Sequence, residues 1–211
     1  MQPPYADDAP LAAEQRAPPK SKLTDGERRE AARLKLRNAL QGGHADVAMG
    51  LLDENPAAAK AMDVDGRYPI HIALKERTGA HIKDNIAVIC MLGEMHPSAC
   101  QAGDPERRGA LPLHSALELG HDDIVCWEVL NRYPAAAMQA SPTDGRLPLM
   151  IAIEHRSSVG VVNDLLKAHP EAIHELDASN RLPLHLALEA RCAHDIIRLL
   201  LKKNAPAALE V

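Results

Sequence analysis

The stretch Leu111-Pro112-Leu113-His114 decides the fold of this chain, because three near-copies of it occur elsewhere. The copies read Tyr68-Pro69-Ile70-His71, Leu147-Pro148-Leu149-Met150 and Leu182-Pro183-Leu184-His185. Their prolines are 35 to 43 residues apart, and a recurrence in this range is typical of stacked copies of one small unit. We therefore expect a repeat solenoid, whose function lies in a surface that the copies build together.

A second series of prolines closes each copy, and apolar columns precede it. The series is Pro56, Pro97, Pro134, Pro170 and Pro206. Nine residues before these prolines lie Val47, Val88, Val125, Val161 and Ile197, and five before lie Leu51, Leu92, Val129, Leu165 and Leu201. Two residues after them lie Ala58, Ala99, Ala136, Ala172 and Ala208. Columns four residues apart share one helical face, so each copy is predicted to bury a second helix that ends before its proline.

The first helix of each copy is predicted to begin at the proline of the four-residue stretch, where the missing N–H is tolerated. Three residues before that proline stand Gly66, Gly109, Gly145 and Asn180, which are residue types that accept a positive φ. A left-handed turn is therefore expected before every first helix.

The copies define the domain boundaries. Residues 1–23 are proline-rich and lack apolar periodicity, so we expect a disordered tail. Thr24 and Glu27 match a capping box that begins a helix to about Leu40, which Gly42 and Gly43 end. Residues 24–211 are expected to form an all-α solenoid of about five repeats. These are an N-terminal cap repeat at 24–62, followed by 63–103, 104–140, 141–176 and 177–211.

Composition narrows the possible partners. The chain has 211 residues, 46% of them apolar, no phenylalanine and only 2% aromatics, which disfavours a large aromatic pocket. A net charge of −5 does not favour nucleic acid or an anionic membrane. No apolar run is long enough to cross a bilayer, and no signal-peptide pattern is present. We expect the protein to be located in the cytoplasm, with the nucleus as the alternative.

The residues that could carry chemistry favour structural roles. The four cysteines, Cys90, Cys100, Cys126 and Cys192, form no CxxC pair, and buried thiols are expected. The eleven histidines recur at equivalent positions of successive copies, too far apart to share one metal ion. No catalytic or nucleotide-binding motif is found. No enzyme activity, metal or cofactor is therefore predicted.

The third copy resembles an ankyrin repeat. The stretch Gly109-Ala110-Leu111-Pro112-Leu113-His114-Ser115-Ala116, followed by Leu119-Gly120-His121-Asp122-Asp123-Ile124-Val125, is similar to that family's T-P-L-H-x-A, G-H and Ile/Val pattern. The resemblance covers residues from about 30 to 211 and implies β-turn fingers followed by two antiparallel helices. Three departures stand out: Tyr68 or leucine replaces the threonine that bonds the motif histidine, Met150 replaces one histidine, and the period is about 36 rather than 33.

The resemblance also implies where a partner binds. Arginines beside the turns would form a row along the fingertips: Arg67, Arg107, Arg108, Arg146 and Arg181. Beside them, the family's contact positions on the first helices fall on Lys75, Glu76, Glu118, Leu119, Glu154, His155, Glu189 and Ala190. Arginines suit bidentate contacts with carboxylates or phosphates of a partner. The alternative is that these arginines are solvated turn residues that only aid solubility.

The predicted function is thus a non-catalytic protein-binding module that presents a concave surface of fingers and first helices to a protein partner. The alternative is a constitutive subunit or assembly factor of a larger complex. That alternative rests on the C-terminal end, where Leu199, Leu200 and Leu201 are followed by only Lys202 and Lys203 as polar cover.

Overall fold

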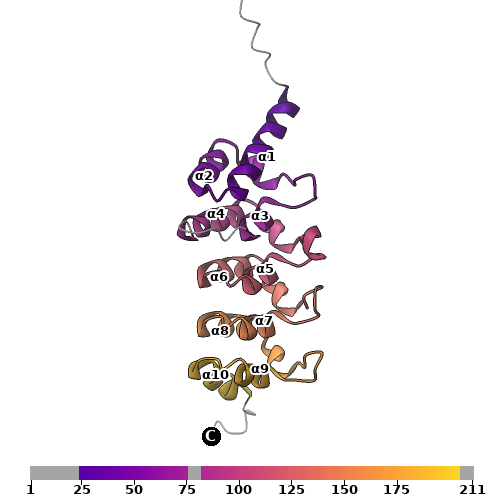
Figure 1. Ribbon diagram of the computed structural model, residues 1–211, viewed down its shortest axis with the longest axis vertical. Helices are drawn as coiled ribbons and strands as arrows, with labels where there is room; N and C mark the ends of the chain where they lie inside the picture. Colours follow the sequence, from indigo (N-terminus) through magenta and orange to yellow (C-terminus); the bar gives the residue numbers. More distant parts are fainter. Residues whose placement is uncertain (1–23, 76–81, 205–211) are drawn as a thin grey trace, which may run out of the picture.

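The structure, a computed structural model, describes residues 24–75 and 82–204, which form ten α-helices and no β-strand. The helices are α1 Asp25–Gln41, α2 Ala45–Glu54, α3 Pro69–Lys75, α4 Ile82–Met95, α5 Pro112–Glu118, α6 Asp123–Arg132, α7 Pro148–Glu154, α8 Val159–Ala168, α9 Pro183–Glu189 and α10 His194–Asn204. They stack in pairs along the long axis (Figure 1), with the odd-numbered helices beside the projecting loops and the even-numbered helices on the other side. The all-helical repeat architecture predicted from the sequence is confirmed.

The first helices begin where the sequence predicts. α3, α5, α7 and α9 each start at the proline of the four-residue stretch. The histidine three residues after the N-cap then accepts a hydrogen bond from the N-cap amide. His114 Nδ1 lies 3.1 Å from Leu111 N, and His71 Nδ1 lies 3.2 Å from Tyr68 N. The motif histidine therefore bonds to backbone where the family's threonine is missing.

The same imidazole rings also bind the loop that ends each repeat. Because Nδ1 accepts a hydrogen bond, Nε2 carries the proton and donates it to a backbone carbonyl of that loop. His71 Nε2 donates to Ala102 O at 2.9 Å, and His114 Nε2 donates to Gln139 O at 2.8 Å. Each ring thus fixes its own helix start and the loop that leads into the next finger.

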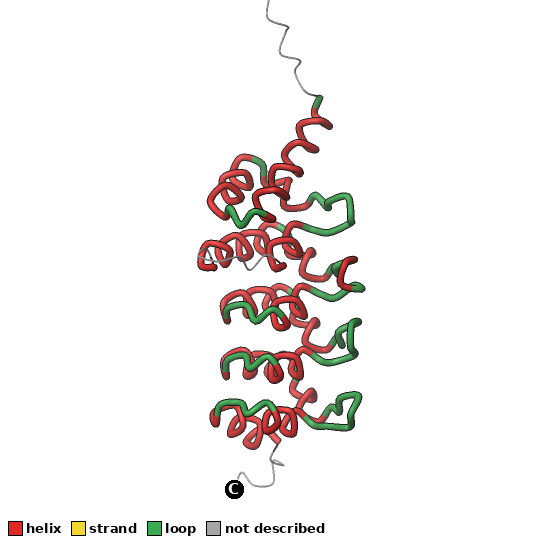
Figure 2. The backbone as a smooth tube through the Cα atoms, in the orientation of Figure 1, coloured by secondary structure: helices red, strands yellow, loops and turns green. Residues whose placement is uncertain are grey.

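Tight turns form the fingers between repeats, which project together on one side of the stack (Figure 2). The four predicted left-handed positions have φ values of 78° at Gly66, 89° at Gly109, 74° at Gly145 and 61° at Asn180. The prediction of a positive φ in every finger is confirmed. Among the described residues the fingers contain no β-strand, and the one β-bridge is an isolated antiparallel pair between Asp104 and Ala110.

Short 3₁₀ helices follow the second helices. They are η1 Pro56–Lys60, η3 Pro97–Gln101, η5 Pro134–Met138 and η6 Pro170–His174, and a shorter one, η4 Pro105–Arg107, lies in a finger. The alanine column two residues after each proline is buried, from Ala136 at 0% exposure to Ala58 at 5%. Pro206 and Ala208 lie outside the described residues.

The core lies between the layers, where each helix packs against its pair and against the neighbouring pairs. The two apolar columns are buried in the middle repeats, but the prediction was wrong by one residue at both ends. In α2 the buried residues are Ala48 and Leu52, while Val47 is 49% exposed. In α10 they are Ile196 and Leu200, while Leu201 is 52% exposed. A single residue separates α2 from its proline, as it does for α4, α6 and α8, and α2 is exposed on one side because it is the first of the second helices in the described stack.

Buried histidines predict a pH-dependent stability. Burial lowers the pKa of His71 and His114, so the unfolded chain binds protons at a higher pH than the folded chain does. The two neutral rings contribute fully to the free energy of unfolding above the unfolded pKa of about 6.5. This contribution is lost as the pH falls towards their lower pKa in the folded chain. We expect the urea midpoint to drop between pH 7.5 and 5.5.

The chain provides its own control for this experiment, because Met150 occupies the same helix position and is 1% exposed. His114→Met should lower the stability at pH 7.5, since two hydrogen bonds are lost, and should flatten the dependence on pH. An equal pH dependence in the wild type and in a variant that lacks both His71 and His114 would contradict this assignment.

Candidate protein-binding surfaces

The first finger arginine is buried. Arg67 is 4% exposed, and its guanidinium contacts Asp63 at 2.9 Å and Asp65 at 3.2 Å within its own finger. It also reaches Glu106 of the next finger at 2.6 Å, and Lys75 binds the same carboxylate at 2.9 Å. Arg67 therefore holds two fingers together and offers little surface to a partner, which corrects the sequence-based expectation for this residue.

The other fingers use one recurring ion pair. An arginine of the finger contacts the glutamate at the end of the following first helix, and the three pairs are Arg107–Glu118, Arg146–Glu154 and Arg181–Glu189. Arg181 also contacts Asp177 at 2.7 Å within its finger and lies 4.0 Å from Glu154 of the preceding repeat. The predicted arginine row and the predicted first-helix row are thus brought together, as partners of each other.

Carboxylates at the base of the fingers remain charged because of these contacts. Burial raises the pKa of Asp63, but hydrogen bonds from the backbone and side chain of Arg67 outweigh that effect and hold the pKa below its usual value. Asp177 and Arg181 repeat this arrangement, and the pKa of Asp177 is also lowered. The hydrogen bond from Lys75 lowers the pKa of Glu106.

Several predicted contact residues are accessible at the surface. Lys75 and Glu189 have 55% and 57% of their side chains exposed, and Arg108 and His155 are also exposed. We call the described members of the predicted set, apart from the buried Arg67, the finger strip. It comprises Lys75, Arg107, Arg108, Glu118, Leu119, Arg146, Glu154, His155, Arg181, Glu189 and Ala190. Glu76 lies outside the described residues.

Sequence reasoning missed a groove on the other side of the stack, between the second helices α6 and α8. Trp127 and Ile124 of α6 are 51% and 56% exposed there. Trp127 lies two residues after the buried Val125, and that spacing places it away from the core side of the helix. The helical spacing could have revealed an exposed tryptophan, but not that a neighbouring helix leaves a hollow beside it.

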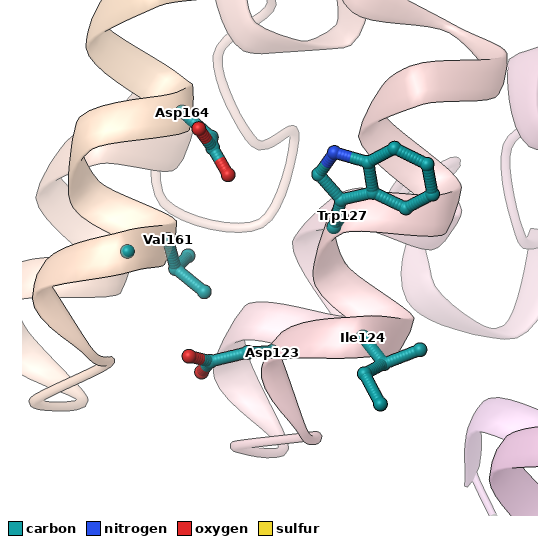
Figure 3. Close-up of a pocket in the computed structure, with 6 residues that line it drawn as sticks. Asp123, Ile124, Trp127, Val161 and Asp164 are labelled. Atoms are coloured by element: carbon teal, nitrogen blue, oxygen red, sulfur yellow. The ribbon is translucent and has the colours of Figure 1, made fainter.

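The groove has polar and apolar walls (Figure 3). The lining residues are Asp123, Ile124, Trp127, Gly160, Val161 and Asp164. Asp123 Oδ2 accepts a hydrogen bond from Ser158, whose hydroxyl also accepts from Val161 N at the start of α8. Asp164 Oδ1 pairs with Lys167 at 2.8 Å. This arrangement places two carboxylates beside an indole ring.

The histidines and cysteines have structural environments. Besides the motif rings, His121 Nε2 lies 2.6 Å from Leu74 O of the preceding repeat. No group of three His, Cys, Asp or Glu side chains in the described ranges is arranged to hold a metal ion. Burial raises the pKa of Cys100 to about 11 and that of Cys126 to about 12, so both thiols stay protonated and unreactive near neutral pH.

Paired antiparallel helices, turn fingers and a core between layers define a helical repeat protein. Residues 113–209 match the family model of the ankyrin repeats (3 copies), and this part of the chain belongs to the ankyrin-repeat family. Ankyrin repeats are in general non-catalytic modules of protein–protein interaction. No curated protein matches the chain. Among the described helices, none has the length and apolar character needed to cross a bilayer.

The role of Arg67 can be tested by Arg67→Met. This change removes the nearer cation of Asp63, which is 3% exposed, and leaves only Arg37 at 3.9 Å, and a broken buried ion pair is costly. We expect a loss of about 2–4 kcal/mol in the free energy of unfolding, measured by urea denaturation.

Arg108→Gly is the matched control, because Arg108 is exposed and has a left-handed φ of 57°. Glycine adopts that conformation without strain, so stability should be unchanged or rise by up to about 1 kcal/mol. Similar losses in both variants would show that Arg67 has no special structural role.

Proposed function

We propose that the chain is a non-catalytic protein-binding module and that its finger strip contacts the partner. The observation that carries this proposal is the repetition of one ion pair, Arg107–Glu118, Arg146–Glu154 and Arg181–Glu189, in three successive repeats. Each pair ties a finger to the first helix beside it. The partly exposed charges are therefore held in fixed positions before a partner arrives.

Preordering lowers the free-energy cost of association. A long charged side chain loses about 0.5–1.5 kcal/mol of conformational freedom when an interface immobilises it. In the finger strip the arginines are already held by their glutamates, and the fingers are held by Arg67 and the motif histidines. Both signs of charge remain accessible: side-chain exposure is 34% for Arg181 and 57% for Glu189. This surface suits a partner with complementary polar groups of both signs.

The proposal predicts that exposed members of the finger strip control affinity. A variant with Lys75→Ala, His155→Ala and Glu189→Ala removes accessible groups from three repeats and leaves the buried Arg67 in place. We expect its affinity for a partner captured from native extract to fall about tenfold or more, because rim charges steer association and several are lost together. Isothermal titration with the identified partner measures the change.

The control variant removes exposed charges elsewhere, with Asp53→Ala, Lys60→Ala and Lys202→Ala. These residues are exposed and lie outside the finger strip. Both variants should unfold at similar urea concentrations. A partner that binds the finger-strip variant as tightly as the wild type would disprove this binding surface.

A second candidate function, a constitutive subunit of a larger complex, is favoured by the C-terminal end of the described stack. Leu188 is 55% exposed, whereas the equivalent Ile153 is fully buried. Leu201 is 52% exposed, whereas the equivalent Leu166 is 4% exposed. The described residues leave this end uncovered, and residues 205–211 are not described.

Sedimentation of the purified full chain distinguishes the two functions. A constitutive subunit is expected to self-associate or aggregate on its own, because an uncovered apolar end favours association. A stable, soluble monomer over a wide concentration range would count against the second function and leave the first intact.

A further inference from the structure

The groove between α6 and α8 has a composition that points to a particular ligand. Trp127 is the only tryptophan of the chain, and half of its side chain is exposed beside Ile124, one turn earlier on α6. Single exposed apolar residues are common on proteins and need no explanation. Here, however, the two side chains line a hollow of about 230 Å³ together with residues of the next repeat.

Gly160 leaves this hollow open. It occupies the position on α8 that Ile124 occupies on α6, one repeat earlier. A Cβ atom at Gly160 would meet Ser158 Oγ at 3.3 Å and Asp123 Oδ2 at 3.6 Å, so a longer side chain would grow into the space beside them. Gly160 lies in the first turn of α8, so any side chain at this position would narrow the groove at its Asp123 end.

The groove continues along the two helices. A second hollow of about 340 Å³ shares Trp127 and Asp164 with the first. Its other lining residues are Leu130, Asn131, Pro134, Lys167 and Ala168. The indole thus lines two adjoining depressions that follow the same two helices, so a ligand can continue past it from one to the other.

Two carboxylates set the charge of the first hollow, and both project into the space between the helices (Figure 3). The Asp123 carboxylate accepts a hydrogen bond from the neutral hydroxyl of Ser158. Asp164 pairs with Lys167 three residues later, but the lysine side chain is 64% exposed. Exposed pairs of this kind contribute little, so an incoming cation can replace Lys167 at small cost.

A matching ligand must combine an aliphatic stem with a cationic head. Lysine and arginine side chains have this form, since their methylene groups pack on apolar surface while their charge remains outside. The face of an indole ring attracts a cation within about 6 Å, and neighbouring carboxylates add to that attraction. An anionic ligand would be repelled by Asp123 and Asp164, which disfavours nucleic acid at this site.

We propose that the groove between α6 and α8 binds a lysine or arginine side chain from a basic segment of a partner protein. The stem lies against Trp127 and Ile124, and the charged head lies between Asp123 and Asp164. This site belongs to the second helices and is separate from the finger strip.

Fluorescence of Trp127 reports directly on this site, because no other tryptophan contributes to the emission. The probe is the acetylated peptide ALRALKA, titrated into the full chain, with ALEALEA as the acidic control. We expect a saturable blue shift of the emission with the basic peptide, since the indole is covered, and no saturable shift with the acidic one. An unchanged emission, or an equal response to both peptides, would overturn the proposal.

Three variants, measured with the labelled peptide by anisotropy, locate the binding site. Asp123→Asn combined with Asp164→Asn should weaken binding about tenfold or more, because both carboxylates that face the cation lose their charge. Gly160→Leu should abolish binding by filling the hollow while the helix is retained. The control is Asp46→Asn with Asp195→Asn, which removes the same charge from exposed sites on α2 and α10 and should bind normally.

The remaining outcomes are also decisive. A control variant that loses as much affinity as the groove variant would show that only net charge matters, and the site would be rejected. Binding that survives Gly160→Leu, with a native circular dichroism spectrum, would place the peptide elsewhere. An emission shift on concentrating the chain without peptide would show that a second copy of the chain covers Trp127, which also overturns the proposal.

Discussion

Each helix pair in this chain can bury its apolar face only against the next pair, and the rest of the structure depends on this constraint. A single pair consists of one short first helix and one short second helix, and it carries too few apolar residues to form a core alone. Stacking removes Leu113, Ala116 and Leu117 completely from solvent in the middle of the array. Where the described stack ends, Leu188, which is equivalent to Leu117, is 55% exposed.

Stacking alone would leave the fingers free to move, and polar contacts between repeats prevent this. His71 and His114 donate to Ala102 O and Gln139 O, so their first helices are tied to the loops that lead into the next fingers. Arg67 adds a buried ion pair that reaches Glu106 of the next finger. Because buried polar groups are costly when unpaired, these contacts require a single alignment of neighbouring repeats.

The repeated architecture could be read from the sequence because it depends on local rules. A proline at a helix start and a glycine at a left-handed turn have the same effect wherever they occur, and Pro112 and Gly109 behave as expected. The register of the end repeats could not be read in this way. Ala48 and Leu52 are buried while Val47 is exposed because α2 is the first of the second helices in the described stack, and counting back from Pro56 does not show which side of a helix lacks a neighbour.

The candidate sites were harder to predict because they depend on contacts between repeats. The exposure of Arg67 is decided by Glu106, which the fold brings to it from the next finger. The groove at Trp127 is open because Gly160, one repeat later, has no side chain. Neither fact is visible in one repeat, and with a single sequence only the stacked structure brings the two residues together.

The distribution of charge explains why the two surfaces suit different partners. In the finger strip, arginines are matched by glutamates of the same repeat, so the surface presents both signs in alternation. The chain as a whole has 29 acidic and 24 basic residues, and the excess must lie outside such balanced pairs. On the α6–α8 face, Asp123 and Asp164 line the first hollow, and Lys167 pairs with Asp164. Since different helices build the two surfaces and neither Trp127 nor His155 supports the core, one surface can vary without disturbing the stack that holds the other.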